Sequence, residues 1–599
     1  MDKGAIKLSE KITTNFSLVE ENLLRQFLFT NPHGSDSFVY PQELVAGEEL
    51  SPLMSAYSRT HTPFQDRVLQ FLDTQKADVT RHMLPLIPGL MQQFRNADGS
   101  LKVSEKTASF NTEWVLAHGH NSIKEETSLF GHSEDISDIT GKKITGHPLA
   151  KPQVKSTRYL SFENVLSRTS QDPDIAFLDK AVQQPIFSSH IADLNRAYLQ
   201  ATERLTNSVL TSTQNREIVA YLAQPHVVQA QVEKNIAAKL RKEPTFQITE
   251  EAITKEKEKY IGSLRDSSVK KDLSKFVLDF TRVYLPAVTR TSLGYSVDAR
   301  TIEEIVTDMI SSPRLEDQQR GMSIWKEAKK VAPILLGDKS HIKVNEWQKS
   351  NENLRNYFRE RFSQIPTINH GKPMVKLVTA RDVDMYSDRW NAALALFPFM
   401  DSSIIDLYAG LANQSDVVDV LKLVHKDRTS YDVLHPSISH GGLVTEFVMP
   451  FHGYRDMFRH RNGSRSVQLL TTDLGFEIPT IFKTFGLDES YLQMTKTNAE
   501  LVRKAQAIDR HAAEKLVMFG ANCRAIHTWQ PNQSGYVDRL RSNQVTGNIT
   551  YVLAAREHTR ALEEIMPETV KFFRTNFTVY PEDMWKKGYA MVDANRTIK

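Results

Sequence analysis

The stretch HGYRDMFRHRNGSRS, residues 452–466, carries the strongest local signal in the chain. Four arginines crowd this segment beside aromatic side chains, and Arg455 and Arg459 would share one face of a helix. A planar guanidinium group can hold a phosphate through two parallel hydrogen bonds. His460, between Arg459 and Arg461, should stay neutral because nearby positive charge lowers the pKa of an imidazole. The segment predicts a site for a diphosphate and the edge of an aromatic ring, with a solvated basic helix or a nucleic-acid patch as the alternative.

Two segments of the first half carry weaker signals. In VLAHGHNSIKEE, residues 115–126, Gly119 permits a tight helix end, and Ser122 can cap the next helix with Glu125 at capping-box spacing. In QVKSTRY, Ser156 and Arg158 lie two apart, so on an extended segment a hydroxyl and a guanidinium group face the same anion. Taken alone, the first segment also fits an ordinary corner between two helices, and the second is not specific.

The composition is that of a globular protein. The 599 residues include 75 basic and 72 acidic side chains, a formal net charge of +3, which argues against nucleic acid as a partner. Cys523 is the single cysteine, so an intramolecular disulfide and a cysteine-based zinc site are excluded, and we expect no bound metal. The N-terminus lacks the apolar stretch of a secretory signal, and no run of 18 apolar residues exists, so we expect a cytoplasmic protein without a membrane span.

Several common nucleotide-binding and catalytic motifs are absent. The chain has no GxxxxGK[ST] loop, no GxGxxG after a strand, no HExxH and no GxSxG. Nucleotide-loop ATPases, Rossmann dehydrogenases, zincins and serine hydrolases therefore lack support.

Taken together, the three segments resemble the flavin-dependent thymidylate synthases. That family has a signature of the form RHR, seven residues, then S-x-R-Y, with an H-G-H segment and a glutamate upstream. The second half of this chain keeps RHR as Arg459, His460 and Arg461. After the seven-residue gap, Leu469 replaces the serine and Thr471 replaces the arginine.

The first half keeps the complementary parts of the same signature. Ser156 and Arg158 match S-x-R, whereas the sequence GHP at residues 146–148 stands where RHR should be. The family's later nucleotide-binding arginine falls at Met309 in this half and is kept in the second half as Arg541. The first half also carries the upstream segment, at His118, Gly119, His120, Ser122 and Glu125. An element similar to R-x-x-L-P includes Arg282 and Pro286, and one similar to V-N-A-R includes Asp298 and Arg300.

The resemblance implies an α+β fold of two tandem thymidylate-synthase-complementing-like repeats, helix-rich around small antiparallel sheets. We divide the chain into an N-terminal extension (1–45), a first repeat (46–338) with a charged helical insertion (about 215–275), a linker (339–374), a second repeat (375–575) and a tail (576–599). Within these, we expect irregular structure over 131–152, one amphipathic helix from about Thr301 to Val331, and a strand in LVTEF or EFVMPF.

The resemblance also implies a function. The family's enzymes are homotetramers that methylate dUMP to dTMP with methylenetetrahydrofolate as carbon donor, FAD as hydride carrier and NADPH as the usual reductant. A duplicated chain would form a homodimer, a pseudo-tetramer of repeats. We hypothesise one composite site between unlike repeats, with His120 and Arg541 as catalytic residues, FAD held by Arg459, His460, Arg461, His120, Ser122 and Glu125, and dUMP held by Ser156, Arg158, Arg282, Arg541 and Arg455.

The separation of the motifs leaves other functions open. Relaxed selection also splits motifs, so the chain could be a catalytically inactive paralogue that acts as a nucleotide-binding or structural protein. A flavoenzyme that acts on another pyrimidine nucleotide is a further alternative. An RNA- or DNA-binding helical protein would use the basic segment, and steep salt dependence of oligonucleotide binding would reveal it.

Overall fold

The computed structural model describes only part of the chain. The described residues are 37–41, 96, 100, 102–103, 105–117, 121–156, 171–211, 220, 222–242, 246–266, 277–338, 340–344, 346–366, 374–379, 382–385, 387–424, 426, 443–460, 462–542, 548–565, 567–570, 573 and 575–577. Nearly all of the predicted N-terminal extension and C-terminal tail lies outside them. Among the described residues, no helix combines the length and the apolar character needed to cross a membrane.

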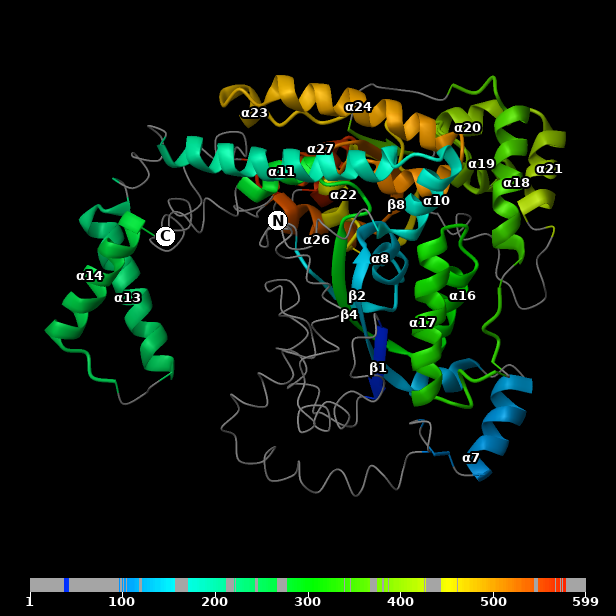
Figure 1. Ribbon diagram of the computed structural model, residues 1–599, viewed down its shortest axis with the longest axis horizontal. Helices are drawn as coiled ribbons and strands as arrows, with labels where there is room; N and C mark the ends of the chain where they lie inside the picture. The colour runs from blue at the N-terminus through cyan, green and yellow to red at the C-terminus, as the bar shows by residue number, and fades with distance from the viewer. Residues whose placement is uncertain are drawn as a thin grey trace.

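The strands form two four-stranded antiparallel sheets at the centre of the molecule (Figure 1). The strand orders are β1-β2-β4-β3 and β5-β6-β8-β7. The strands are β1 Ser37–Pro41, β2 Ser128–Ser137, β3 Lys151–Val154, β4 Arg290–Asp298, β5 Val375–Val378, β6 Val444–Pro450, β7 Ser464–Val467 and β8 Asn522–Thr528. With many helices around these small sheets, the fold is α+β, as the sequence predicts, and the strand expected around LVTEF is present as β6.

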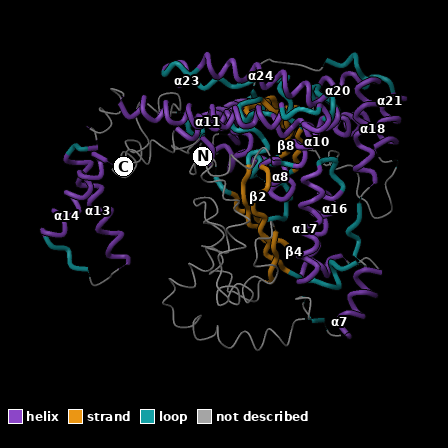
Figure 2. Tube along the Cα trace, viewed as in Figure 1, coloured by secondary structure: helices purple, strands orange, loops and turns teal. Residues whose placement is uncertain are grey.

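Helices cover and connect the two sheets (Figure 2). The α-helices are α7 Glu105–Phe110, α8 Asp138–Thr145, α10 Pro173–Val182, α11 Ile186–Thr211, α13 Pro225–Lys242, α14 Glu250–Asp266, α16 Ala299–Ile310, α17 Leu315–Val331, α18 Glu346–Arg361, α19 Asp388–Leu396, α20 Ile404–Gly410, α21 Gln414–Val424, α22 Phe451–Met457, α23 Thr480–Thr484, α24 Asp488–Gln506, α25 Arg510–Ala513, α26 Pro531–Ser542, α27 Ile549–Glu563 and α28 Pro567–Val570. Short 3₁₀ turns cover Asn121–Glu126, Arg282–Tyr284, Phe397–Phe399 and Glu514–Leu516, and a π-helical turn covers Asn111–Ala117.

The two sheets share one pairing register. In the first sheet Lys151 lies opposite Ser296, and in the second Ser464 lies opposite Thr528. Aligning these two pairs makes Lys151 the counterpart of Ser464 and Ser296 the counterpart of Thr528, and the other β3/β4 and β7/β8 pairs then match in step. Counting onward from Ser296 and Thr528 also matches α16 with α26, first residue to first and last to last. A common register supports the tandem duplication, which stays a prediction.

Residues 131–152, expected to be irregular, are instead mostly regular structure, so that prediction was wrong. They hold most of β2, all of α8 and the start of β3. β2 contains a bulge between Ser133 and Ile136, where Asp135 has a φ of 55°. The side chain of Ser137 then caps α8 by accepting a hydrogen bond from the amide of Thr140. The polar residues that resembled a loop therefore serve as a bulge and a helix cap.

The single helix expected from about Thr301 to Val331 is also a wrong prediction, because two helices occupy this stretch. Helix α16 ends at Ile310, and α17 begins at Leu315 after a turn that contains Pro313. The carboxylate of Asp174 accepts hydrogen bonds from the backbone amides at the start of α17, from Leu315 at 2.7 Å and from Glu316 at 3.2 Å. The turn lets α16 and α17 pack against each other beside the first sheet (Figure 1).

The charged insertion forms helices, as expected. Helices α13 and α14 pack on each other through a small core and lie to one side of the other helices (Figure 1), while Val227 of α13 belongs to the main core and Tyr260 of α14 packs against it. Helix α18 lies within the predicted linker, and its Phe358 is buried in a core with α19, α20 and α21.

The two halves join through reciprocal backbone hydrogen bonds. The amide of Ala287 donates to the carbonyl of Val517 at 2.8 Å, and the amide of Phe519 donates to the carbonyl of Leu285 at 2.7 Å. In the shared register the two donors, Ala287 and Phe519, are counterparts, and so are the two acceptors, so the contact is two-fold in character. Around this junction, apolar side chains from both halves form one continuous core.

A buried charge cluster ties the halves together beside this junction. Lys515, which is 0% exposed, contacts Asp172 at 2.7 Å, Asp174 at 2.8 Å and Glu316 at 2.5 Å. Arg290 also pairs with Asp172 and Glu316. Burial raises the pKa of Asp172 to about 7, although Lys515 opposes the rise. Three first-half carboxylates therefore share one second-half lysine.

We predict that Lys515→Met will strongly destabilise the protein. Removal of one partner leaves buried carboxylates uncompensated, which typically costs about 3–5 kcal/mol. Chemical denaturation followed by circular dichroism would measure the loss. Adding Asp172→Asn should restore part of the stability, because it removes one of the unmatched charges. The control Lys496→Met, at an exposed position of α24, should change stability by less than about 0.5 kcal/mol, and an equal effect of both lysine variants would contradict the prediction.

Candidate functional site

The basic segment divides at the end of α22. Arg455 lies within this helix and is buried, whereas Arg459 follows the helix and has 56% of its side chain exposed. The two side chains therefore do not share one helical face, contrary to the sequence expectation, because the helix ends at Met457. Arg455 pairs with Asp138 at the start of α8, and its guanidinium carbon lies 4.6 Å from the centre of the Phe519 ring.

Asp456 brings together arginines from both halves. Its carboxylate lies 3.7 Å from Arg282 Nη2 and 3.9 Å from Arg459 Nε. Its main-chain oxygen accepts a hydrogen bond from Arg541 Nη2 at 2.7 Å. Arg282 comes from the first half and Arg541 from α26 of the second. Three residues selected from separate motifs thus converge on one acidic residue.

His460 is held as a neutral acceptor. Arg541 donates through Nε to His460 Nε2 at 2.8 Å, and its guanidinium carbon lies 5.0 Å from the centre of the Tyr551 ring. Burial, reinforced by the positive charge of Arg541, lowers the pKa of His460 to about 3. The neutral state expected from the sequence follows from this environment.

A second layer of polar groups surrounds Arg282. Asp279 lies 3.0 Å from Arg282 Nη2, and Asn548 donates to Asp279 at 3.4 Å. His452 pairs with Glu477, which also accepts from Thr550 at 2.8 Å. We call Arg282, Arg455, Arg459 and Arg541, with Asp138, Asp279 and Asp456, the arginine cluster. Its four guanidinium groups exceed its three carboxylates, so the cluster has a net positive charge.

Other predicted site residues are placed only partly. His120, Arg158 and Arg461 lie outside the described residues, as does the side chain of Ser122. Ser156 is buried just beyond the end of β3. Glu125 is exposed and pairs with Arg300 at 2.5 Å, which joins two motif residues of the first half to each other. Their proposed roles around FAD and dUMP stay predictions.

The pairing register gives the same correspondences as the motifs. Counting back from the aligned starts of β3 and β7 makes Arg459 the counterpart of Gly146. Counting onward from the aligned strands β4 and β8 makes Arg541 the counterpart of Met309. Both relations are those that motif spacing predicts, so the strands and the motifs align the two halves in the same way.

Two important residues were missed from the sequence. Asp456 lies inside the quoted basic stretch, but nothing local marks it as a shared acceptor. Glu514 is the counterpart of Arg282, and only the register reveals this relation.

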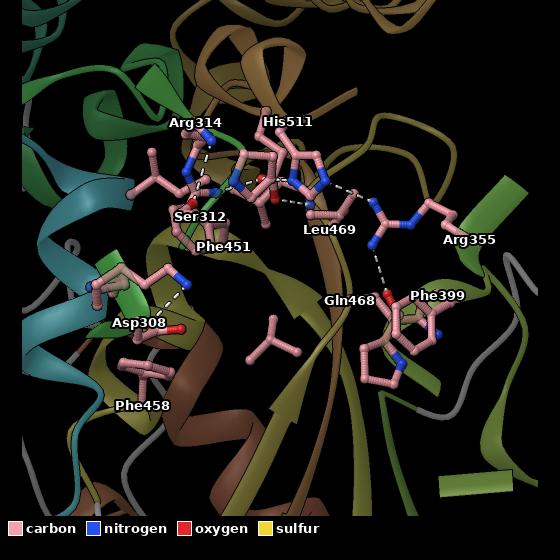
Figure 3. Close-up of a pocket in the computed structure, with 18 of the residues that line it drawn as sticks. Asp308, Ser312, Arg314, Arg355, Phe399, Phe451, Phe458, Gln468, Leu469 and His511 are labelled. Atoms are coloured by element: carbon pink, nitrogen blue, oxygen red, sulfur yellow. Dashed lines mark hydrogen bonds and ion pairs between the residues drawn. The ribbon is translucent and has the colours of Figure 1, made fainter. Parts of the chain in front are cut away.

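A cavity of about 380 Å³ lies between the halves at the counterpart position (Figure 3). Its lining includes Lys142, the counterpart of Arg455, together with Glu514 and Leu469, the counterparts of Arg282 and Ser156. The chain therefore has two related sites of unlike chemistry, one rich in arginine and one with these groups replaced.

Comparison with known proteins is consistent with the motifs. The chain is 23% identical over 324 residues to a UPF0159 protein of Chlamydia muridarum, a match that covers 51% of this chain and 58% of the relative. It is 24% identical over 311 residues to a UPF0159 protein of Chlamydia pneumoniae (50% and 57%), and 24% identical over 287 residues to one of Thermoplasma acidophilum (47% and 55%). The matched part thus spans little more than half the length of these curated relatives. No solved structure matches the chain.

A protein-family model matches most of the first half of the chain. Residues 90–334 match the model described as "Thymidylate synthase complementing protein". This segment contains Ser156 and Arg282 and ends close to the predicted boundary of the first repeat. The resemblance that the first-half motifs indicate is thereby confirmed: over residues 90–334, this chain matches the thymidylate synthase complementing protein family.

Proposed function

We propose that the protein methylates dUMP to dTMP in a flavin-dependent reaction, at a composite site formed around the arginine cluster. The observation that carries the proposal is the convergence of Arg282, Arg459 and Arg541 on Asp456. Each residue comes from a motif that only one half retains. A chain in which every half-motif had decayed at random would have no reason to keep the surviving arginines together.

The donor groups of the cluster fit phosphorylated ligands. Guanidinium groups bind phosphate in a planar, two-pronged geometry, and four of them outnumber the three carboxylates. Arg459 is the most exposed, and its contact with Asp456 at 3.9 Å is the longest in the cluster. It is therefore the side chain best able to turn toward an incoming diphosphate. Arg282 and Arg541, both buried, are fixed more firmly and suit a nucleotide monophosphate.

The chemistry assigned to the chain is binding and orientation. FAD, when bound, would supply the hydride, methylenetetrahydrofolate the carbon and NADPH the reducing equivalents, so no protein nucleophile is required. His460 remains uncharged and accepts a hydrogen bond from Arg541, which fixes the direction of that guanidinium group. Asp456 holds Arg282 and Arg541 close together before any ligand arrives. A homodimer would complete the pseudo-tetramer of repeats.

One observation favours a second candidate, a nucleotide-binding protein without turnover. Asp138, Asp279 and Asp456 already pair with cluster arginines, so the cluster can be stable without a ligand. A flavoenzyme that acts on another pyrimidine nucleotide would use the same arginines. Substrate turnover, rather than binding alone, separates these candidates.

We expect purified protein to bind FAD and dUMP and to release tritium from 5-labelled dUMP when folate and reductant are supplied. Visible absorbance of bound flavin and calorimetric titration would measure binding. Binding of dUMP without tritium release would favour the nucleotide-binding protein. Protein that remains colourless after addition of FAD would exclude the flavin-dependent function.

We further predict that Arg541→Met will lower the affinity for dUMP by about 10- to 100-fold, the equivalent of one charge-assisted hydrogen bond. Arg389→Met is a matched control. Arg389 also donates to main-chain carbonyls, at 2.6 and 2.8 Å, and lies over an aromatic ring at 4.3 Å, but it belongs to α19. Unchanged dUMP affinity in a folded Arg541→Met protein would count against the assigned role.

The pKa of His460 gives a pH prediction. Its folded-state pKa of about 3 lies below the usual value of 6.5, so the stability linked to its neutral form is fully present above pH 6.5 and is lost as the pH falls toward 3. Between pH 6.5 and 4.5 the free energy of unfolding of the wild type should fall by about 2–3 kcal/mol more than that of His460→Gln. This follows from about 1.4 kcal/mol for each pH unit. Urea denaturation of both proteins at the two pH values would measure this difference, and parallel losses would disprove the assignment.

A further inference from the structure

The cavity between the halves is the counterpart of the arginine cluster, yet it lacks that cluster's phosphate-binding groups. In Figure 3, Asp308 and Phe458 border it on one side and Arg355 and Phe399 on the other, with Arg314 and Leu469 between them. First-half residues line it from α8 and the turn after α16, and second-half residues line it from α22 and the segment after β7.

The replacements make this cavity a poor second nucleotide site. Glu514 takes the position of Arg282, and its carboxylate is held by Arg314 at 2.6 Å and by the amide of Leu470 at 2.8 Å. Leu469 takes the position of Ser156, so a hydroxyl donor is lost. A phosphate placed beside Glu514 would meet a buried negative charge.

Of the two lysines that line the cavity, Lys142 has the longer ion pair and is therefore the freer to meet an incoming anion. It is 21% exposed, and its nearest carboxylate, Asp138, is 3.8 Å away and also pairs with Arg455. The Lys142 amine lies 5.5 Å from the centre of the Phe458 ring. Lys143, which also lines the cavity, has a closer partner of its own in Asp308, at 2.9 Å.

The rest of the lining suits a flat apolar body. Phe399, Phe451, Tyr454 and Phe458 supply aromatic surface, and the volume of about 380 Å³ falls in the range of small-molecule pockets. A polar anchor at one point of an aromatic cavity is the usual arrangement for binding a small ligand in one orientation.

We propose that this cavity binds a small aromatic carboxylic acid of one or two rings, with Lys142 as the cation that holds its carboxylate. The groups that face Lys142 are Asp138 on its own helix and Arg455, Asp456 and Arg459 on and beyond α22. Burial lowers the pKa of Lys142 to about 8, so the amine is protonated at neutral pH. The cavity shares Asp138 with the arginine cluster, but the proposal does not depend on the function proposed for that cluster.

Calorimetric titration of the full chain at pH 7 with naphthoate, and with its uncharged amide naphthamide, tests the proposal. Wild-type protein should bind naphthoate at least about tenfold more tightly than naphthamide, and Lys142→Met should remove that preference. Lys143→Met, the matched control, should change naphthoate affinity less than about threefold. Leu469→Trp should weaken both ligands by filling the cavity, which locates the binding.

Three results would overturn the proposal. The first is no binding of naphthoate by wild-type protein. The second is an equal loss in the two lysine variants, which would mean that general positive charge is responsible. The third is loss of naphthoate binding in Arg541→Met, which would place the ligand in the arginine cluster instead. Because dUMP binding is measured separately, failure here leaves the proposed thymidylate chemistry untouched.

Discussion

The reciprocal hydrogen bonding between the segments around Pro286 and Met518 is the constraint on which the rest of the structure depends. Equivalent segments of the two halves pair with each other here. Residues a few positions before each segment therefore lie against the opposite half. Arg282 lies shortly before Pro286 and reaches Asp456 in the other half. Glu514 lies shortly before Met518 and reaches the cavity beside Lys142. One contact therefore positions residues of both the arginine cluster and the cavity. The two sites differ in chemistry because equivalent positions of the two halves carry different residues.

The charges at the two sites differ for a physical reason. Buried guanidinium groups carry a high desolvation cost unless carboxylates or a ligand compensate them. In the arginine cluster, Asp138, Asp279 and Asp456 provide part of that compensation and leave an excess positive charge. In the cavity, Glu514 is itself the buried ion and Arg314 compensates it. Asp138 lies between Arg455 and Lys142, so a single carboxylate touches both sites.

Sequence reasoning predicted the residues whose chemistry is visible locally. The basic stretch, the neutral His460 and the counterparts Met309 and Arg541 all follow from motif order and spacing. The acidic partners could not be predicted, because Asp138 and Arg455 are 317 positions apart and no local pattern joins them. The roles given to His120, Arg158 and Arg461 stay predictions, since they lie outside the described residues.

The fold was predictable at the level of class but not of short elements. Residues 131–152 read as loop because β2 and α8 carry glycine, serine and aspartate, residues that here form a bulge and a cap. Register, by contrast, is a property of paired strands, and it became visible only when β3 and β7 could be compared with their partners.

The junction also favours the pairing of unlike halves, which a composite site requires. Lys515 contacts Asp172, Asp174 and Glu316 of the first half, whereas its counterpart, Val283, packs in the apolar core. If two first halves met through this surface, valine would face the three buried carboxylates, and they would lose their lysine. Breaking a buried ion pair in this way costs about 3–5 kcal/mol. The pairing of first with second half is therefore selected by charge at the same surface that brings Arg282 to Asp456.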